Sequence, residues 1–290
     1  MRGHLHTRAG RETTMTRAND RSMTGTTEAE LHSAGLRFRH SGPIAEITLC
    51  KPERRNTQSP AMWRALAGLG QTMPADVRIL VVRAEGPSFS AGLDRSMLNA
   101  TGNTETIAGL LDGSDVTIAR KIREYQDGFM FLRDSNFISI AAVQGHAVGA
   151  GFQLALACDL RIVADNAVFC MKEPTLGLVP DLTGLTPLVR QVGYGRALEI
   201  CVRARNLDAK EAEALGLAHC VVPADNLERE VEDWARGLLQ ADTGAARETK
   251  ALLQSAEVSD IDLQRQLEGA AQARLLRALF ATTDGPGRQF

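Results

Sequence analysis

Residues 149–160, GAGFQLALACDL, form the stretch that decides the fold, because two glycines bracket a turn and an apolar segment follows them. Glycine lets the backbone approach a neighbouring segment or a ligand closely, and the first amides of a helix have no partner inside the helix. Gln153 lies near the start of the apolar segment, and its amide cannot exchange a proton at neutral pH. We therefore expect backbone amides at this turn to be available to a ligand, while the side chain of Gln153 cannot act as an acid or base.

Strands and helices alternate on both sides of this turn. FISIAAVQGHAVGAG predicts one buried strand that enters the turn, and VRILVVRAE predicts another that leads into a second glycine turn, GPSFSAGLD. LRFRHSGPIAEITLCKP alternates apolar and polar residues as a hairpin does, SPAMWRALAGLGQTM is typical of a helix with a serine cap, and RIVADNAVFCMKE predicts a strand-turn-strand. Together these segments indicate repeating strand-strand-helix units. The sequence predicts an α/β fold built from such units.

Three regions follow from this pattern. Residues 1–34 are rich in Arg, Thr, Ser and Gly and show no apolar period, so we expect a disordered N-terminal extension. Residues 35–225 hold the strand-strand-helix core. Residues 226–290 show only helical segments with apolar stripes, which predicts a C-terminal helical region that folds over the core or packs on another subunit.

Composition limits the possible partners and the compartment. The 33 basic and 35 acidic residues give a net charge of −2, so no broad basic surface for nucleic acid is expected. No apolar run has the length of a membrane span or forms a signal core, which argues against a membrane partner. The five cysteines (Cys50, Cys158, Cys170, Cys201, Cys220) lie far apart without CxxC pairing, so we expect buried thiols in a cytoplasmic protein.

An ordered set of segments resembles the enoyl-CoA hydratase/isomerase family, also called the crotonase superfamily, from about residue 36 to residue 225. The segments are FSAGLD, AAVQGHAVGAGFQLALACDLRIV, FCMKEPTLGLVPDLTG, VGYGRALEI and LDAKEAEALGLAHCVVP. The resemblance implies a crotonase-like spiral of strand-strand-helix units. It also implies an acyl-CoA thioester ligand and C-terminal helices that form a homotrimer or a dimer of trimers.

The resemblance further implies an oxyanion hole made by the backbone N–H groups of Leu93 and Ala150, which would hold the thioester oxygen. Substrate-binding residues implied around it are Ser90, Ala91, Gly92, Gly149 and Gln153, with Arg54, Arg55 and Arg95 as candidates for the coenzyme A phosphates. No cofactor beyond the coenzyme A of the substrate is expected. No His, Cys, Asp and Glu residues cluster at metal-ligand spacing, so no metal site is expected either.

The carboxylates decide which reaction is expected. Hydratases of the family place one glutamate in the segment that corresponds to GFQLALACD and another in MKEPTLG, where this chain has Gln153 and Glu173. Water addition needs two proton-handling groups, and Gln153 cannot be one of them. Asp181 corresponds to an aspartate of dienoyl-CoA isomerases and of certain dehalogenases. We therefore expect Glu173 and Asp181 to catalyse double-bond isomerisation of an enoyl- or dienoyl-CoA, and His146 to be structural.

Other interpretations stay open at this point. An enoyl-CoA hydratase with a substituted first glutamate is the nearest alternative. An acyl- or aryl-CoA hydrolase or dehalogenase would use Asp181 as a nucleophile, and a protein that binds a CoA ligand without catalysis would need neither acid. Glu173 could also be a solvated loop residue, and Asp181 could be a helix cap.

Overall fold

Two β-sheets form the centre of the computed structural model, which describes residues 27–98 and 106–281. Within these residues the large sheet has the strand order β1-β2-β3-β4-β6-β9, and the small sheet has the order β5-β7-β8. The pairs β1–β2 and β7–β8 are antiparallel, and all other neighbours run parallel. The strands are β1 Leu36–Ser41, β2 Ile44–Leu49, β3 Ile79–Ala84, β4 Ile138–Val143, β5 His146–Val148, β6 Leu160–Ala164, β7 Val168–Cys170, β8 Leu207–Asp208 and β9 Cys220–Val222.

The chain passes repeatedly from the large sheet to the small one. Strand β4 is followed by β5, and β6 by β7, while Ser90 beyond β3 forms a parallel bridge with Ala147 of β5. This confirms the predicted spiral of strand-strand-helix units. The prediction of one strand over residues 137–151 is wrong, because Gly145 turns the chain with φ of 55° between β4 and β5. A Cβ atom at Gly145 would lie 2.0 Å from the Pro87 carbonyl oxygen, so the turn needs glycine.

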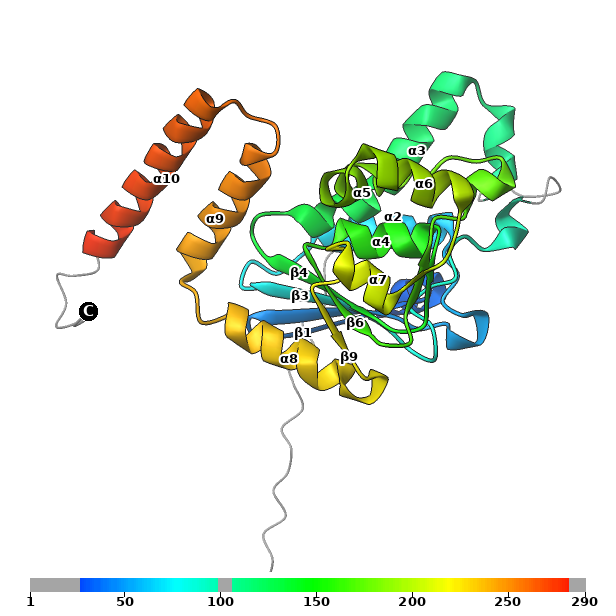
Figure 1. Cartoon of the computed structure of the whole chain (residues 1–290), viewed down its shortest axis with the longest axis horizontal. Coiled ribbons are helices and arrows are strands. Elements are labelled where there is room, and N and C mark those ends of the chain that lie inside the picture. The colour runs from blue at the N-terminus through cyan, green and yellow to red at the C-terminus, as the bar shows by residue number, and fades with distance from the viewer. Residues whose placement is uncertain (1–26, 99–105, 282–290) are drawn as a thin grey trace, which may run out of the picture.

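Helices cover the sheets, as Figure 1 shows. The α-helices are α1 Glu28–Ala34, α2 Pro60–Gln71, α3 Asp115–Met130, α4 Ala150–Ala157, α5 Leu185–Val192, α6 Tyr194–Arg203, α7 Ala209–Ala214, α8 Leu227–Leu238, α9 Thr243–Ala256 and α10 Ile261–Ala281. Short 3-10 turns are η1 Pro52–Arg54, η2 Arg95–Leu98, η3 Ala108–Asp112, η4 Phe131–Arg133, η5 Glu173–Leu176 and η6 Ala224–Asn226.

Both faces of the large sheet are buried. Leu80, Val82 and Val143 belong to the main core with α2 and α4, whereas Val81 and Ile140 belong to a second core under α8. Parallel strands that are covered on both faces have continuous apolar sequences, which explains why VRILVVRAE was recognisable as a strand. All eight residues of α4 are buried, so this helix lies inside the domain.

The predicted disordered extension is too long at its C-terminal end. Thr27 and Glu30 form a capping box at the start of α1, and Leu31 and Ala34 of this helix are buried. The capping bonds and two apolar contacts stabilise a helix that is too short for its periodicity to be recognised in the sequence. Residues 1–26 of the predicted extension lie outside the described residues.

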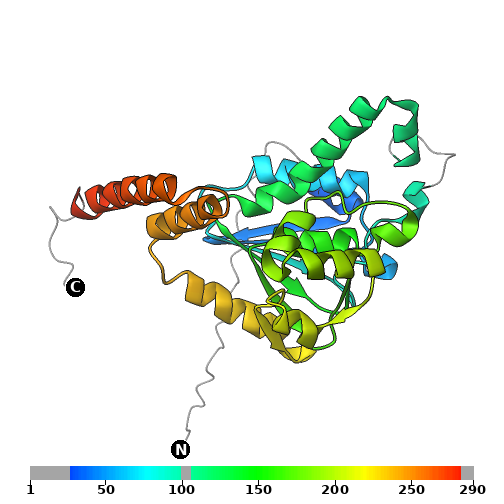
Figure 2. The same cartoon turned by 45° about the horizontal axis from the view of Figure 1, so that its top comes forward.

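The predicted C-terminal helical region begins with α8, which covers the large sheet, and continues with α9 and α10. Figures 1 and 2 show α9 and α10 side by side, with α10 farther from the two sheets than α9. Residues 282–290 lie outside the described residues. Within the described part of the chain, no helix combines the length and the apolar character that a membrane crossing requires.

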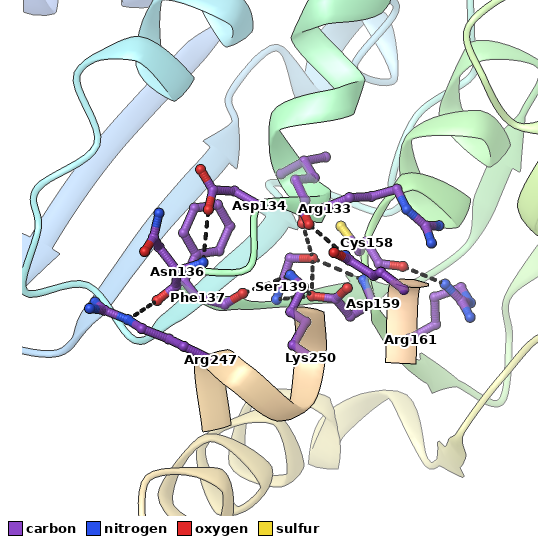
Figure 3. Close-up of polar contacts among 12 residues, drawn as sticks. Arg133, Asp134, Asn136, Phe137, Ser139, Cys158, Asp159, Arg161, Arg247 and Lys250 are labelled. Atoms are coloured by element: carbon purple, nitrogen blue, oxygen red, sulfur yellow. Dashed lines mark hydrogen bonds and ion pairs between the residues drawn. The ribbon is translucent and has the colours of Figure 1, made fainter. Parts of the chain in front are cut away.

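A buried lysine attaches α9 to the core, as Figure 3 shows. Lys250 is 8% exposed, and its Nζ donates to the Phe137 carbonyl at 2.7 Å and to Asp159 Oδ2 at 2.6 Å. The same carboxylate oxygen accepts from Ser139 N at 2.7 Å and from Ser139 Oγ at 3.0 Å. Nearby, Arg247 donates to the carbonyls of Asn136 and Ala75. The position of α9 therefore depends on a largely desolvated ion pair.

Replacing Lys250 by methionine is expected to lower the free energy of unfolding by about 3 kcal/mol, because it leaves the Asp159 carboxylate without its cation. The double variant K250M/D159N should cost less than the sum of the two single variants. Denaturant unfolding at fixed protein concentration measures these free energies. K121M is the control, because Lys121 forms an i,i+3 ion pair with Glu124 at the surface, and it should lower the free energy of unfolding by less than about 0.5 kcal/mol. Strictly additive costs for Lys250 and Asp159 would contradict the role of the pair.

Candidate active site

The two glycine turns of the sequence meet in the structure. Gly92 has φ of 84°, and a Cβ atom there would lie 2.4 Å from the Val148 carbonyl oxygen and 3.5 Å from the Ala150 nitrogen. Glycine is therefore required at position 92 by both its backbone angle and the close approach of the second turn. The backbone after β3 and the start of α4 thus lie in direct contact.

The amides of Leu93 and Ala150 both lack a partner at this contact. Gln58 and Leu93 form a parallel β-bridge, in which Gln58 N donates to the Gly92 carbonyl at 2.8 Å and Asp94 N donates to the Gln58 carbonyl at 2.8 Å. The Leu93 N–H therefore points away from Gln58. Ala150 is the first residue of α4 and has no acceptor within its own helix. Among residues 27–98 and 106–281, neither amide has a hydrogen-bond acceptor. Such a pair of donors can stabilise a developing oxyanion.

Ser90, predicted to bind substrate, is fully buried and bonded to protein groups. Its Oγ donates to the Asn56 carbonyl at 2.7 Å and accepts from Gln58 Nε2 and from Gly92 N, each at 3.2 Å. The hydroxyl therefore holds the Gly92 turn in place. Ala91 is fixed through its backbone, since its N–H donates to the Arg55 carbonyl at 2.9 Å.

Glu173 lies against the second glycine turn. It is the first residue of η5, and a Cβ atom at Gly149 would lie 3.2 Å from its Oε1. This oxygen accepts from Gln153 Nε2 at 2.7 Å, while Oε2 is buried without a hydrogen-bond partner among the described residues. Burial raises the pKa of Glu173, the charge of Asp181 raises it further, and the bond from Gln153 opposes the rise. Glu173 is therefore not a solvated loop residue.

Asp181 occupies the loop between η5 and α5. Burial raises the pKa of its carboxyl group, and its charge acts on Glu173, so the two acids share one region of the molecule. The alternative role as a helix cap is not seen, because α5 starts after Gly184 without a side-chain cap. Thr183, two residues on, has φ of 69°, a left-handed conformation that is uncommon for threonine and is frequent in functional loops.

Gln153 connects the two acidic segments and was predicted only to line the pocket. It is fully buried in α4, and its Oε1 accepts from Leu182 N at 2.8 Å and from Gly184 N at 3.3 Å, in addition to the bond that its Nε2 donates to Glu173. Gln126 of α3 also escaped prediction, and its Nε2 donates to the Asp181 carbonyl at 2.7 Å. Nothing in one sequence indicates which distant loops such amides join.

The predicted arginines surround the Gly92 turn. Arg54 forms an ion pair with Asp94 at 2.8 Å, and its side chain is 53% exposed. Arg55 and Arg95 are exposed, and Arg55 is tied to the turn through its carbonyl. Two of the three predicted arginines are therefore attached to this turn, Arg54 through its ion pair with Asp94 and Arg55 through its backbone carbonyl.

The remaining candidates lie outside this arrangement. His146 is exposed and its Nδ1 lies 3.4 Å from Ser88 Oγ. The five cysteines are free, and four are buried as predicted, whereas Cys220 at the edge of the large sheet is half-buried. Burial raises the pKa of Cys158 to about 12 and that of Cys201 to about 11, which keeps these thiols protonated. In the described ranges, no three His, Cys, Asp or Glu side chains gather as metal ligands would.

The raised pKa of Glu173 makes a prediction about stability. Below about pH 4 the carboxyl group is protonated in both the folded and the unfolded chain. As the pH rises, the unfolded chain releases this proton first, because the pKa of Glu173 is higher in the folded chain, and the free energy of unfolding therefore falls. Glu173→Gln should therefore raise the free energy of unfolding at pH 7, and the gain should vanish below about pH 4. Glu232→Gln, which alters an exposed carboxylate of α8, should change stability little at either pH. A destabilised E173Q at pH 7 would contradict the buried-acid arrangement.

Comparison with known proteins identifies the family of this chain. The family model described as Enoyl-CoA hydratase/isomerase matches residues 39–286. A peroxisomal Delta(3,5)-Delta(2,4)-dienoyl-CoA isomerase of Arabidopsis thaliana is 32% identical over 230 residues, covering 77% of this chain and 82% of the relative. A Rhizobium meliloti (strain 1021) protein, provisionally named an enoyl-CoA hydratase, is 31% identical over 247 residues, covering 84% and 88%.

A solved structure is similar over nearly the whole chain. It is a provisionally named enoyl-CoA hydratase from Thermobifida fusca YX in complex with acetoacetyl-CoA, with 47% identity and a TM-score of 0.84, and the match covers 88% of this chain and 100% of that chain. The family model covers more than half of the chain, and relatives more than 30% identical cover more than two thirds of it. The chain therefore belongs to the enoyl-CoA hydratase/isomerase family.

Proposed function

We propose that this protein is an isomerase that moves a double bond in an enoyl- or dienoyl-CoA. The observation that carries the proposal is the set of groups at the site. Two backbone amides have no acceptor among the described residues, Glu173 lies against the turn that carries one of them, and the charge of Asp181 acts on Glu173. The third side chain, Gln153, cannot exchange a proton. This set suits removal of a proton at one carbon and its return at another.

In the proposed reaction, the thioester oxygen accepts hydrogen bonds from the amides of Leu93 and Ala150. Glu173 Oε2 removes a proton from the acyl chain, and the electron pair moves toward the thioester oxygen to form an enolate held by the two amides. Asp181 delivers a proton to a different carbon, and solvent resets the two acids. Burial favours this division of labour, because raised pKa values bring both carboxyl groups closer to the working pH.

The ligand is proposed to be an acyl-CoA thioester, since the Thermobifida fusca relative was crystallised with acetoacetyl-CoA. Arg54, Arg55 and Arg95 are proposed to meet its phosphates. The enolate is stabilised by the backbone amides, so the proposed chemistry calls for no cofactor beyond the coenzyme A of the substrate. The free thiols are those of a protein in a reducing compartment, and we include a cytoplasmic location in the proposal.

Enoyl-CoA hydratase is the second candidate, and the names of the Rhizobium and Thermobifida relatives favour it. Water addition would require Glu173 and Asp181 to handle both protons of one water without help from position 153. The two activities separate by product, because isomerisation moves the conjugated double bond whereas hydration removes it.

Glu173→Gln and Asp181→Asn are each expected to lower kcat for dienoyl-CoA isomerisation by about 10²-fold or more, because each removes a proton-transfer group. Affinity for acetoacetyl-CoA should change by less than about threefold, since neither acid contributes to the oxyanion hole. The rates are followed by ultraviolet absorbance of the dienoyl thioester, and E232Q and D225N serve as exposed controls. Wild-type protein that hydrates a 2-enoyl-CoA faster than it isomerises any dienoyl-CoA would contradict the isomerase proposal.

Assembly into a trimer or a dimer of trimers is proposed from the C-terminal hairpin. Helix α10 packs on α9, yet Leu263, Leu267 and Leu276 on it are exposed, which is unusual for large apolar side chains on one helix. Sedimentation should give a mass three or six times the chain mass of 31.3 kDa, and Leu267→Glu should lower it. A monomeric wild-type protein at micromolar concentration would contradict this assembly.

A further inference from the structure

The carboxamide of Gln153 has a defined orientation. Two backbone donors, Leu182 N and Gly184 N, face one end of it, and the Glu173 carboxylate faces the other. A flipped amide would direct its NH₂ group at two N–H donors and its oxygen at a carboxylate, so only the present orientation satisfies all three contacts. Because Gln153 is fully buried, water cannot replace these bonds.

The amide also distinguishes the two oxygens of Glu173. Oε1 accepts from Gln153 Nε2, whereas Oε2 is buried without a partner in the described residues. A buried carboxylate oxygen without a partner is costly, and in native proteins it calls for an explanation such as a catalytic role. The bond to Oε1 restrains the rotation of the carboxylate and leaves Oε2 as the oxygen without a side-chain or backbone partner among the described residues.

The loop that carries Asp181 depends on the same amide. Leu182 and Gly184 both donate to Gln153 Oε1, and between them Thr183 adopts its left-handed conformation with φ of 69°. The site for the amide is tight, since a Cβ atom at Gly184 would lie 2.7 Å from Gln153 Cγ. One buried side chain on a rigid helix thereby holds both acidic segments.

We infer that Gln153 is a positioning residue that orients Glu173 so that Oε2 alone transfers the proton, and that holds the Asp181 loop in register with it. This inference rests on the proposed isomerisation and deepens it. A glutamate at this position would put two carboxylate oxygens within hydrogen-bond distance and require a shared proton. A glutamine provides the donor in every protonation state of Glu173.

Other ionisable groups also surround Glu173. Asp181 acts on it from the loop before α5, while Cys170 of β7 and Cys201 of α6 lie near enough for the charge of Glu173 to act on them. Burial raises the pKa of both thiols, and those of Glu173 and Asp181 are raised as well. Removing the donor at position 153 should therefore shift the titration of Glu173 to higher pH, because the ionised form loses its hydrogen bond.

Gln153→Leu is the direct test. Gln264→Leu is its matched control, because Gln264 is also a buried glutamine but belongs to α10 rather than α4. In Q153L, kcat for isomerisation should fall about 10- to 100-fold through misplacement of the acids, and the acid limb of the pH–rate profile should move to higher pH. The dissociation constant of acetoacetyl-CoA should change less than about twofold. Q264L should keep the wild-type rate and profile.

A readout that needs no turnover separates this inference from the proposed function. Carboxyl ¹³C NMR of protein labelled at glutamate Cδ follows the titration of Glu173, and E173Q assigns its signal. The inference is supported if Q153L raises the titration midpoint of Glu173, whether or not the wild type isomerises any dienoyl-CoA. It is overturned if the midpoint does not move. Absence of isomerase turnover in the wild type would sink the proposed function alone.

Gln153→Glu provides a second variant, which keeps an acceptor for the Leu182 and Gly184 amides if Q153L fails to fold. Here one proton must be shared with Glu173, so the pH–rate profile should gain a further step at the pH where both groups become ionised, separate from the alkaline limb that ionisation of Asp181 gives in the wild type. A Q153E profile that coincides with the wild type would also overturn the inference.

Discussion

The contact between Gly92 and the Val148–Ala150 turn is the constraint on which the site depends. No side chain fits at position 92, because its Cβ would lie 2.4 Å from a carbonyl oxygen. That close approach brings the Leu93 amide beside the first amide of α4, and the Ser90 hydroxyl and the Ser90–Ala147 bridge hold the approaching turn. The spiral path of the chain also brings the two turns together, because β3 and β4 are parallel neighbours and the turns follow their carboxyl ends. The site is therefore made first by backbone, and side chains are added to it.

Helix α4 is held at its C-terminal end. Its N-terminal amide faces the site, and at its C-terminal end the fully buried Arg161 donates to the Ala155 carbonyl at 3.2 Å and to the Cys158 carbonyl at 2.8 Å. Burial lowers the pKa of Arg161 to about 10, so it remains cationic at neutral pH, where it balances the negative end of the helix. The same helix carries Gln153, which reaches both acidic segments. A rigid helix thus positions one oxyanion donor, the Ala150 amide, and through Gln153 both acidic segments, and this supports the preorganisation that the proposed chemistry requires.

The fold could be predicted from the sequence, because the order of strands, helices and glycine turns is visible in short segments and resembles a known family, and the two glycine turns that meet at the candidate site were among those segments. Aliphatic strands buried on two faces, the Ser59 cap of α2 and the glycine turns are features of short segments. The division of residues 137–151 into β4 and β5 was missed although Gln144, Gly145 and His146 interrupt the apolar run, because a glycine inside a strand pattern can equally mark a bulge in one strand. The roles of Gln153 and Ser90 were also missed. Their bonding partners are 29 and 34 residues away in the chain, and an isolated glutamine or serine gives no sign of them.

The proposed isomerisation requires that one thioester oxygen lies between two peptide nitrogens while Glu173 and Asp181 face the neighbouring carbons. The most direct measurement is a crystal structure of this protein with bound acetoacetyl-CoA. The proposed mechanism predicts that the thioester oxygen lies about 2.7–3.1 Å from both Leu93 N and Ala150 N. It also predicts that Glu173 Oε2 and the Asp181 carboxylate are directed at the acyl carbons. An oxygen that contacts neither nitrogen, or an acyl chain that lies away from both acids, would contradict it.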